Sequence, residues 1–206
     1  MTAKYSLLYF DLRARGEAIR MLFKHAGVDF EDKKITFAEF PEVKADVTKT
    51  PSGSLPVLTT PCGKKIVQTT AILRYVANEL NLYGNGNVER AMIDAIVDTH
   101  KEVHDLMISL EFGTKDEDKP EKRKQLENTI HKSFKFYEIF IKDNESKDHF
   151  VGKAISLADI YFVDVVDYMN VSLPENKILE QYAVLKNIDS KTREAENIKK
   201  YLSERK

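Results

Sequence analysis

Tryptophan is absent from this sequence, and Cys62 is its single cysteine. One thiol excludes a disulfide within the chain and favours a reducing compartment. Neither charge is in real excess, with 32 basic and 33 acidic residues, so the basic footprint that follows nucleic-acid phosphates is missing. No apolar run approaches membrane-spanning length, and the first residues lack the pattern of a signal sequence. We therefore expect a cytoplasmic protein with neither nucleic-acid nor membrane partners.

The first chemically informative stretch is a strand, a turn and a helix at the N-terminus. Residues 4–10 are mostly apolar, which predicts a strand buried on both faces. Helical spacing of apolar residues begins at about Glu17 and ends before Gly27, a suitable C-terminal cap. A strand-to-helix turn points free N–H groups and the positive end of the helix dipole outward. Tyr9 and Arg15 flank that turn, and together they favour an anion site.

The rest of the N-terminal half predicts a small mixed sheet with helices. Residues 28–35 read as an edge strand, and 41–44 as a helical turn. Pro56 stands second in the strand 55–58, where a missing donor is tolerated. A hairpin turn then leads into a pairing strand, 64–67, and a helix opens at residues 68–70. The predicted order is βαβαββα with four strands.

The C-terminal half predicts helices only. Apolar residues follow helical spacing over 88–110 and 126–141, and another helix begins at Ser156. We expect a solvated loop over the charged residues 114–123. Two further surface helices are expected at 178–185 and 189–204. The resulting domains are 1–82 (α/β) and 88–206 (all-α), joined by a linker at 83–87.

Two side-chain pairs have both a structural and a functional interpretation. Ser156 and Asp159 fit a helix capping box, which we favour over a catalytic Ser–Asp pair. His100 and His104 lie one helical turn apart and are spaced to bind a metal. In zinc proteases, however, the glutamate directly follows the first histidine, and here it does not. We predict no metal site.

Five segments in order give the chain a family resemblance. It resembles the glutathione transferases, most closely the sigma class. That resemblance implies a thioredoxin-like N-terminal domain that binds glutathione, an all-α C-terminal domain that completes a cleft, and a homodimer. The segments are Tyr9-Phe10-x-x-Arg13-x-Arg15-x-Glu17, Leu55-Pro56-Val57-Leu58, Gln68-Thr69-x-Ala71-Ile72-x-Arg74-Tyr75, Asp94-Ala95-Ile96-Val97-Asp98-Thr99 and Ser156-Leu157-Ala158-Asp159-Ile160-Tyr161-Phe162.

The resemblance implies a role for each site residue. Tyr9 would donate a hydrogen bond to the glutathione sulfur, with Arg15 reinforcing the field. A free thiol has a pKa of about 8.5, and its thiolate is the nucleophile, so such a donor would activate it. Arg13 and His104 would line the electrophile pocket, and Glu102, or else Asp98, would reach the partner subunit's glutathione. The other implied glutathione contacts are Phe40, Lys44, Gly53, Ser54, Leu55, Pro56, Gln68 and Thr69.

The sequence also departs from the sigma pattern. Phe40 replaces the usual tryptophan, and the loop 48–54 is longer than usual, which leaves the register of Gly53 and Ser54 open. Lys101 interrupts the acidic cluster that binds a divalent cation in prostaglandin-forming members, and Ser109 stands near the place of their pocket aromatic.

We therefore expect conjugation of the glutathione thiolate to electrophilic apolar small molecules, a detoxification activity. Two alternatives stay open at this point: a glutathione-dependent prostaglandin D synthase, and a non-catalytic carrier of hydrophobic ligands.

Overall fold

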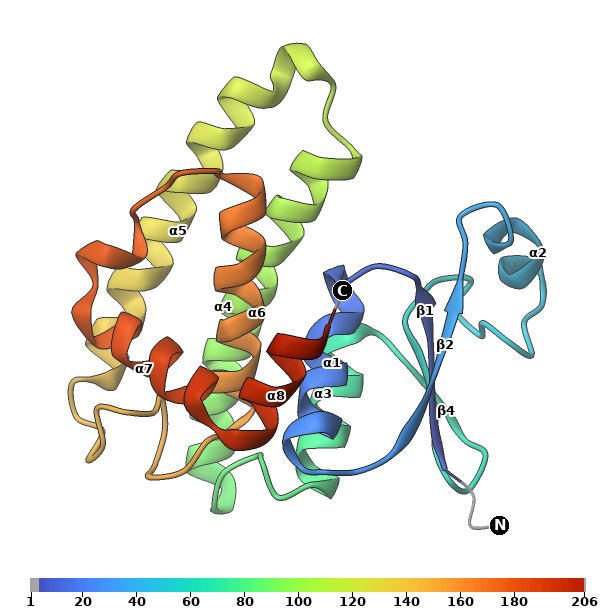
Figure 1. Cartoon of the computed structure of the whole chain (residues 1–206), viewed down its shortest axis with the longest axis horizontal. Helices are drawn as coiled ribbons and strands as arrows, with labels where there is room; N and C mark the ends of the chain where they lie inside the picture. The colour runs from blue at the N-terminus through green and yellow to red at the C-terminus, as the bar shows by residue number, and fades with distance from the viewer. Residues whose placement is uncertain (1–3, 206) are drawn as a thin grey trace.

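A computed structural model describes residues 4–205 of the chain. Its sheet has four strands in the order β2-β1-β3-β4 (Figure 1). The central strand β1 (Tyr5–Phe10) pairs in parallel with β2 (Phe30–Ile35) and antiparallel with β3 (Val57–Thr59). The hairpin closes with β4 (Lys65–Val67), which runs antiparallel to β3. As expected, β2 is an edge strand.

Three helices belong to this sheet. Helices α1 (Ala14–His25) and α3 (Thr69–Glu79) lie between the sheet and the C-terminal helices, whereas α2 (Phe40–Ala45) lies at the outer end (Figure 1). The predicted order βαβαββα is confirmed. Helix α1 begins three residues before the expected start, in a turn that is closed by a hydrogen bond from the Gly16 N–H to the Arg13 carbonyl at 3.1 Å.

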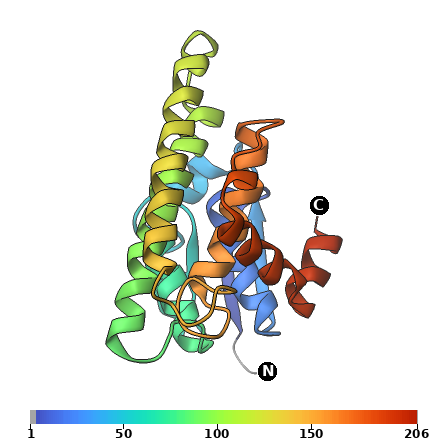
Figure 2. The same ribbon diagram turned by 90° about the vertical axis from the view of Figure 1, so that its left-hand side faces the viewer.

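The C-terminal half is helical, as predicted. Helices α4 (Gly86–Phe112) and α5 (Lys119–Ile141) stand side by side as a long antiparallel pair, and α6 (Leu157–Ser172) packs against α4 (Figures 1 and 2). The chain then continues through η2 (Leu179–Gln181), α7 (Ala183–Glu194) and α8 (Glu196–Glu204), which returns to α1 (Figure 2).

Two local predictions in this half were wrong. Residues 114–123 are not all loop: a 3-10 turn, η1 (Asp116–Asp118), leads directly into α5, whose first turn contains Pro120. Proline is well suited there because first-turn N–H groups have no partner within the helix. The expected break between 185 and 189 also does not occur, since Leu185, Ile188 and Thr192 form one continuous buried face of α7.

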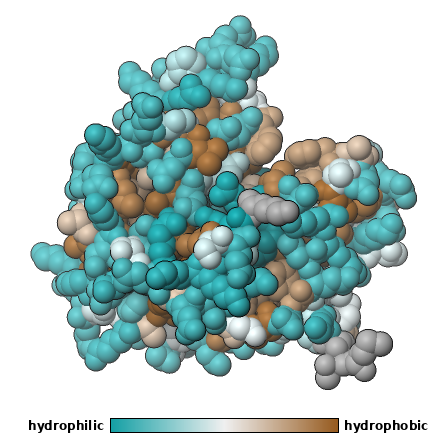
Figure 3. Space-filling view, in the orientation of Figure 1, coloured by the Kyte–Doolittle hydropathy of each residue, from teal (hydrophilic) through white to brown (hydrophobic). Residues whose placement is uncertain are grey.

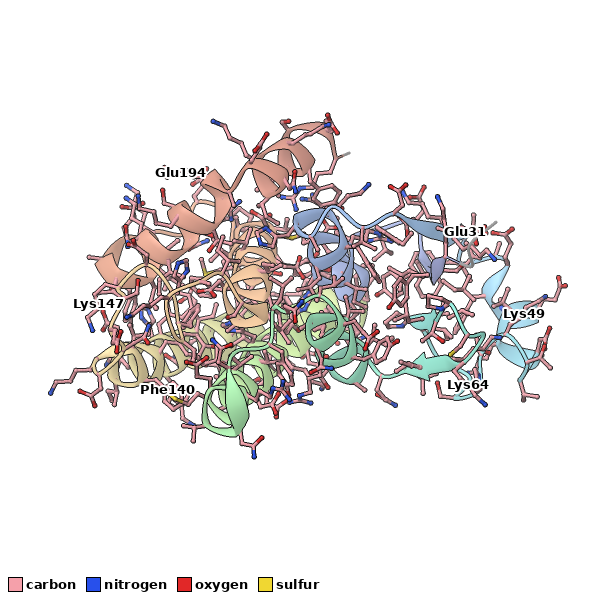
Figure 4. All side chains as sticks on the ribbon, turned by 90° about the horizontal axis from the view of Figure 1, so that it is seen from below. Glu31, Lys49, Lys64, Phe140, Lys147 and Glu194 are labelled. Atoms are coloured by element: carbon pink, nitrogen blue, oxygen red, sulfur yellow. The ribbon has the colours of Figure 1, made fainter. Side chains whose placement is uncertain are left out.

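One hydrophobic core runs through both halves. It includes Leu7 and Leu58 of the sheet, Ile19 of α1, Ile72 of α3 and Ile96 of α4, all fully buried. Seen from below, Lys49 and Lys64 lie at the sheet end of the molecule and Phe140 and Lys147 at the helical end, with packed side chains between (Figure 4). Within residues 4–205, no helix combines the length and apolar character needed to cross a membrane.

A buried ionic cluster fastens the C-terminal residues to α1. Glu17 is 1% exposed and accepts hydrogen bonds from the Tyr201 hydroxyl at 3.1 Å and the Arg205 guanidinium at 2.9 Å. Arg205 also pairs with Asp167 of α6, which accepts a second bond from Arg193 at 2.8 Å. The turn that carries Arg13 and Arg15 is therefore tied to α6 and to the end of the chain.

Candidate active site

The turn after β1 holds Tyr9 in one position. Tyr9 is 4% exposed, and its hydroxyl oxygen accepts a hydrogen bond from the Arg15 N–H at 3.2 Å. That bond occupies an acceptor position, so the hydroxyl proton is available for another group. Burial raises the pKa of Tyr9, an effect that the Arg15 contact only partly offsets. Tyr9 therefore keeps its proton at neutral pH and acts as a buried hydrogen-bond donor.

Gly16 is the residue that allows this arrangement. A Cβ atom at position 16 would lie 2.6 Å from Cδ1 of Tyr9, closer than side chains tolerate. The ring of Tyr9 therefore packs directly against the backbone of the first turn of α1. Any side chain at position 16 would displace the hydroxyl from the Arg15 N–H.

Arg15 is held by a residue that sequence reasoning missed. Its guanidinium donates from Nε at 3.2 Å and from Nη2 at 2.7 Å to Oδ1 of Asp105 on α4. Lys101 pairs with the other carboxylate oxygen. Burial opposes ionisation of Asp105, but Lys101 and Arg15 outweigh it and lower the pKa of this carboxyl. Asp105 therefore holds the Arg15 guanidinium in place, and no motif in the sequence marks Asp105.

The strand register brings three of the predicted segments to the same edge of the sheet. Tyr9 lies at the carboxyl end of β1, and Leu8 pairs with Val57 at the start of β3. The Leu55–Pro56 bond, which is cis, comes just before that start. Val57 in turn pairs with Val67, so Gln68 and Thr69 leave β4 at the same edge.

Gln68 and Thr69 form the entrance of α3. Gln68 has a φ of 74°, a backbone angle that residues other than glycine rarely adopt. Thr69 begins the helix and is 8% exposed. Strained backbone of this kind persists where surrounding structure enforces it, and such positions cluster at ligand sites. The free N–H groups of the first helical turn suit an anionic group.

The remaining predicted contacts lie on α2 and the loop that follows it. The ring of Phe40 packs edge-on against Phe10, with centroids 5.1 Å apart. Lys44 lies beside Gly53, its Cε 3.7 Å from where a Cβ of that glycine would stand. The Thr50 hydroxyl donates to the Val43 carbonyl at 3.1 Å, which holds the loop against α2. Ser54 is exposed farther along that loop.

A cavity of about 120 Å³ adjoins the Arg13–Gly16 turn. It lies between that turn and the helices α4 and α6, and the two lobes show apolar residues on both sides of their notch (Figure 3). Of the two residues predicted for the electrophile pocket, the structure places Arg13 on the cavity wall. The cavity is lined by Leu12, Arg13, Ala14, Phe112, Asp164, Asp167, Tyr168 and Val171.

His104 is not among the residues that line this cavity. It is 1% exposed, its Nδ1 lies 3.1 Å from the Tyr161 hydroxyl, and its ring packs edge-on against Tyr168, with centroids 5.1 Å apart. Burial lowers the pKa of His104 to about 4, so the ring is neutral. His104 therefore reaches the cavity only through Tyr168. Sequence reasoning missed Phe112, Asp164 and Tyr168, which are scattered over two helices.

The two acids considered for a partner's site lie on α4. Asp98 accepts a hydrogen bond from Arg74 Nη2 at 2.7 Å, and Asp94 accepts one from Arg74 Nε at 2.5 Å. Glu102 is exposed and lines an open surface groove together with Asp98, Lys101 and Asp105. Both carboxylates are exposed, but that of Asp98 is already bound by Arg74.

The fold and this edge-of-sheet site define a class: an α/β domain with a cis-proline before its third strand, completed by an all-α domain. Comparison with known families agrees. Residues 5–78 match the family described as glutathione S-transferase, N-terminal domain, and residues 101–205 match glutathione S-transferase, C-terminal domain. The chain belongs to the glutathione S-transferase family and is a transferase.

Individual relatives support the same placement. A glutathione S-transferase of Anopheles gambiae is 32% identical over 98% of this chain and 96% of its own length. The hematopoietic prostaglandin D synthase of Gallus gallus is 38% identical over 77% of this chain and 75% of its own.

Two solved structures are also similar. The monomeric glutathione S-transferase of Necator americanus superposes with a TM-score of 0.87 at 28% identity, covering 98% of each chain. The sigma class glutathione S-transferase of Fasciola hepatica gives 0.86 at 26% identity, covering 100% of this chain and 98% of that one.

Proposed function

We propose that Tyr9 stabilises the thiolate of bound glutathione and that the cavity beside Arg13 holds the electrophile. The observation that carries this assignment is the bond from the Arg15 N–H to the Tyr9 oxygen, which leaves the hydroxyl proton to be donated. A donor fixed before the reaction lowers the energy of a charged sulfur without reorganisation. Arg15, held by Asp105, adds a positive charge beside it.

The rest of the glutathione molecule would bind along the same edge of the sheet that carries Tyr9. The backbone around Leu55 and Pro56 would pair with the peptide in an extended strand-like mode. Gln68 and Thr69 would hold its γ-glutamyl carboxylate at the entrance of α3. Phe40, Lys44 and the Gly53–Ser54 loop would contact the glycine end, where a lysine ammonium favours a terminal carboxylate.

The finer class assignment is the sigma class, which the likeness to the Fasciola hepatica enzyme supports. Prostaglandin isomerisation is the second candidate, favoured by the 38% identity with the Gallus gallus synthase. Although Ser109 stands near the expected aromatic position, α4 does place another aromatic, Phe112, on the cavity wall. Incubation with a prostaglandin endoperoxide and glutathione, followed by product analysis, separates the two activities.

We also propose that the protein is a homodimer and is located in the cytoplasm. The exposed carboxylate of Glu102 on α4 is available to a partner's glutathione, and the exposed free thiol of Cys62 suits a reducing compartment. One of the similar solved structures is of a monomeric enzyme. Sedimentation equilibrium distinguishes the two states.

The decisive test is ultraviolet difference titration of the glutathione thiolate on wild type and on Tyr9→Phe. We expect the wild type to lower the thiol pKa from about 8.5. Tyr9→Phe should still bind glutathione but leave that pKa near 8.5, and kcat/KM for 1-chloro-2,4-dinitrobenzene should fall about 100-fold.

Tyr75→Phe, a matched loss of a hydroxyl on α3 away from the site, is the control and should change neither quantity. A wild type that binds glutathione without forming thiolate near neutral pH would contradict the role of Tyr9 and favour a ligand carrier.

A further inference from the structure

One face of α6 is turned toward the cavity beside Arg13. Asp164, Asp167, Tyr168 and Val171 follow at i, i+3, i+4 and i+7, and all four line the cavity. Asp164 is 2% exposed, and its Oδ2 is buried without a hydrogen-bond partner among residues 4–205. A buried carboxyl oxygen without a partner is destabilising, so its presence calls for a functional explanation.

Two arginines near Asp164 are bound to other carboxylates, whereas a third, Arg13, lines the same cavity as Asp164. Arg205 pairs with Glu17 and Asp167, and Arg193 pairs with Asp167. Burial, together with the negative charges of Glu17 and Asp167, raises the pKa of Asp164 well above its usual range, although Arg205 and Arg13 act in the opposite direction. These effects favour the protonated form of Asp164, which can donate a proton. An ionised Asp164 would in turn raise the pKa of three nearby tyrosines, Tyr9, Tyr161 and Tyr168.

The Arg13–Gly16 turn lies between the cavity that Asp164 lines and the proposed site of the glutathione sulfur at Tyr9. Arg13 and Ala14 line the cavity, and Arg15 donates its N–H to the Tyr9 hydroxyl. A molecule in the cavity therefore lies close to the sulfur that Tyr9 would hold.

We propose that Asp164 is the proton donor for a short acceptor substrate whose reactive alkene is conjugated to a carbonyl group, an α,β-unsaturated aldehyde or ketone. This inference rests on the proposed function, since the nucleophile is the glutathione thiolate. A carboxylic acid recognises an oxygen acceptor, and a carbonyl oxygen gains negative charge when a thiolate adds to the conjugated alkene. The apolar walls formed by Phe112 and Val171, and a volume of about 120 Å³, suit a short chain.

The chemical step balances without a further reagent. The sulfur lone pair forms a bond to the β-carbon, the alkene π pair moves toward the carbonyl, and the carbonyl oxygen takes the proton of Asp164. The enol product then returns to the carbonyl form by proton exchange with water, and the Asp164 carboxylate regains a proton from water. Nothing is oxidised or reduced. The proton of the glutathione thiol passes to water earlier, when the thiolate forms.

The test compares two substrates on three proteins. trans-2-Hexenal requires protonation of its oxygen, whereas 1-chloro-2,4-dinitrobenzene loses chloride and requires no proton. The proteins are wild type, Asp164→Asn, which keeps shape and an N–H donor but has no acidic proton, and Asp164→Val, which matches the neighbouring valines. Thermal unfolding and glutathione binding establish that each variant is folded.

We expect the ratio of kcat/KM for hexenal to that for chlorodinitrobenzene to fall about tenfold in Asp164→Asn and about 100-fold in Asp164→Val, in line with the contribution of general acids. In the wild type the same ratio should decrease as pH rises and Asp164 loses its proton, whereas in Asp164→Asn it should not depend on pH. Taking the ratio removes the ionisation of the thiol, which affects both substrates.

An unchanged ratio in folded variants, with chlorodinitrobenzene still conjugated by the wild type, would overturn the role of Asp164 and leave the proposed function standing. A wild type that forms no thiolate and conjugates neither substrate would overturn the proposed function, and this inference with it. A ratio that falls in both variants but does not change with pH in the wild type would also overturn proton donation.

Discussion

Helix α6 carries two buried aspartates in very different surroundings. Asp159, in the first turn, is fully buried and accepts three hydrogen bonds, from the Phe150 N–H at 2.9 Å and from the N–H and hydroxyl of Ser156 at 2.8 Å each. Asp164, five residues later, is almost as buried, but its Oδ2 has no partner among the described residues and its side chain lines a cavity. Burial raises the pKa of both carboxyls, and for Asp164 the shift is large.

The difference shows that burial alone does not determine what an acid does. Asp159 satisfies backbone donors that would otherwise be stranded at the start of α6, so its contribution is to stability. The Oδ2 of Asp164 meets no donor among the described residues and is destabilising where it stands, which leaves this carboxyl free to act on a molecule that enters the cavity. The two positions can therefore be separated by experiment.

The largest effect is expected from Asp159→Ala. This change removes the acceptor of three hydrogen bonds and strands the N–H groups of Phe150 and Ser156 in the core, so the free energy of unfolding should fall by about 3 kcal/mol. Denaturation in urea, followed by circular dichroism, measures it.

Asn170→Ala, on the exposed side of the same helix, is the control and should change the unfolding free energy by less than about 0.5 kcal/mol. A loss below about 1 kcal/mol in Asp159→Ala would mean that the network around Ser156 can reorganise without its acceptor.

The next effect concerns the pH dependence of stability. The folded state keeps the proton of Asp164 above pH 3.8, its usual pKa, where the unfolded chain has released it. Because the folded state binds more protons, stability should fall as pH rises from about 3.8 until folded Asp164 also ionises, with a slope of up to about 1.4 kcal/mol per pH unit.

Asp164→Asn has no acidic proton at this position. Its unfolding free energy should therefore not show the decrease with pH that Asp164 causes in the wild type. Urea denaturation of both proteins at several pH values gives the difference, from which the contributions of Asp159 and Asp105 cancel. Parallel curves over this pH range would mean that Asp164 is already ionised in the folded protein.

The smallest effect is expected from Ser156→Ala. Asp159 keeps its bonds to the two backbone N–H groups, and only the hydroxyl side of the capping box is lost. The free energy of unfolding should therefore fall by about 1 kcal/mol, a third of the effect of removing Asp159. An unchanged midpoint in thermal unfolding would show that the aspartate alone caps α6.

Sequence reasoning performed best where a structure is encoded in consecutive residues. The order βαβαββα, the edge position of β2 and the capping box at Ser156 all follow from local patterns of strand, turn and helix-start residues. The segments around Tyr9, Pro56 and Gln68 were also recognisable, because each is a short contiguous motif. Their meeting at one edge of the sheet required the strand register, which a sequence does not display.

The residues that sequence reasoning missed come from separate helices. Asp105 holds Arg15 from 90 positions away, and Asp164 lines the same cavity as Arg13 although the two lie in different halves of the chain. Neither has a neighbour in sequence that reveals the contact. His104 was expected to line the electrophile pocket because its helix borders the cleft. In the structure, Tyr161 and Tyr168 pack around its side chain.

The close approach between Gly16 and the ring of Tyr9 has a consequence for how this sequence can change over generations. A mutation at position 16 alone meets the tyrosine ring at 2.6 Å, whereas after loss of that ring the nearest neighbour left is Nη1 of Arg20 at 3.1 Å, the far end of a flexible side chain. A side chain at position 16 is therefore easier to accommodate once the ring is gone, so the order of the two changes matters. A lineage can abandon the glycine more readily after it has already given up the tyrosine.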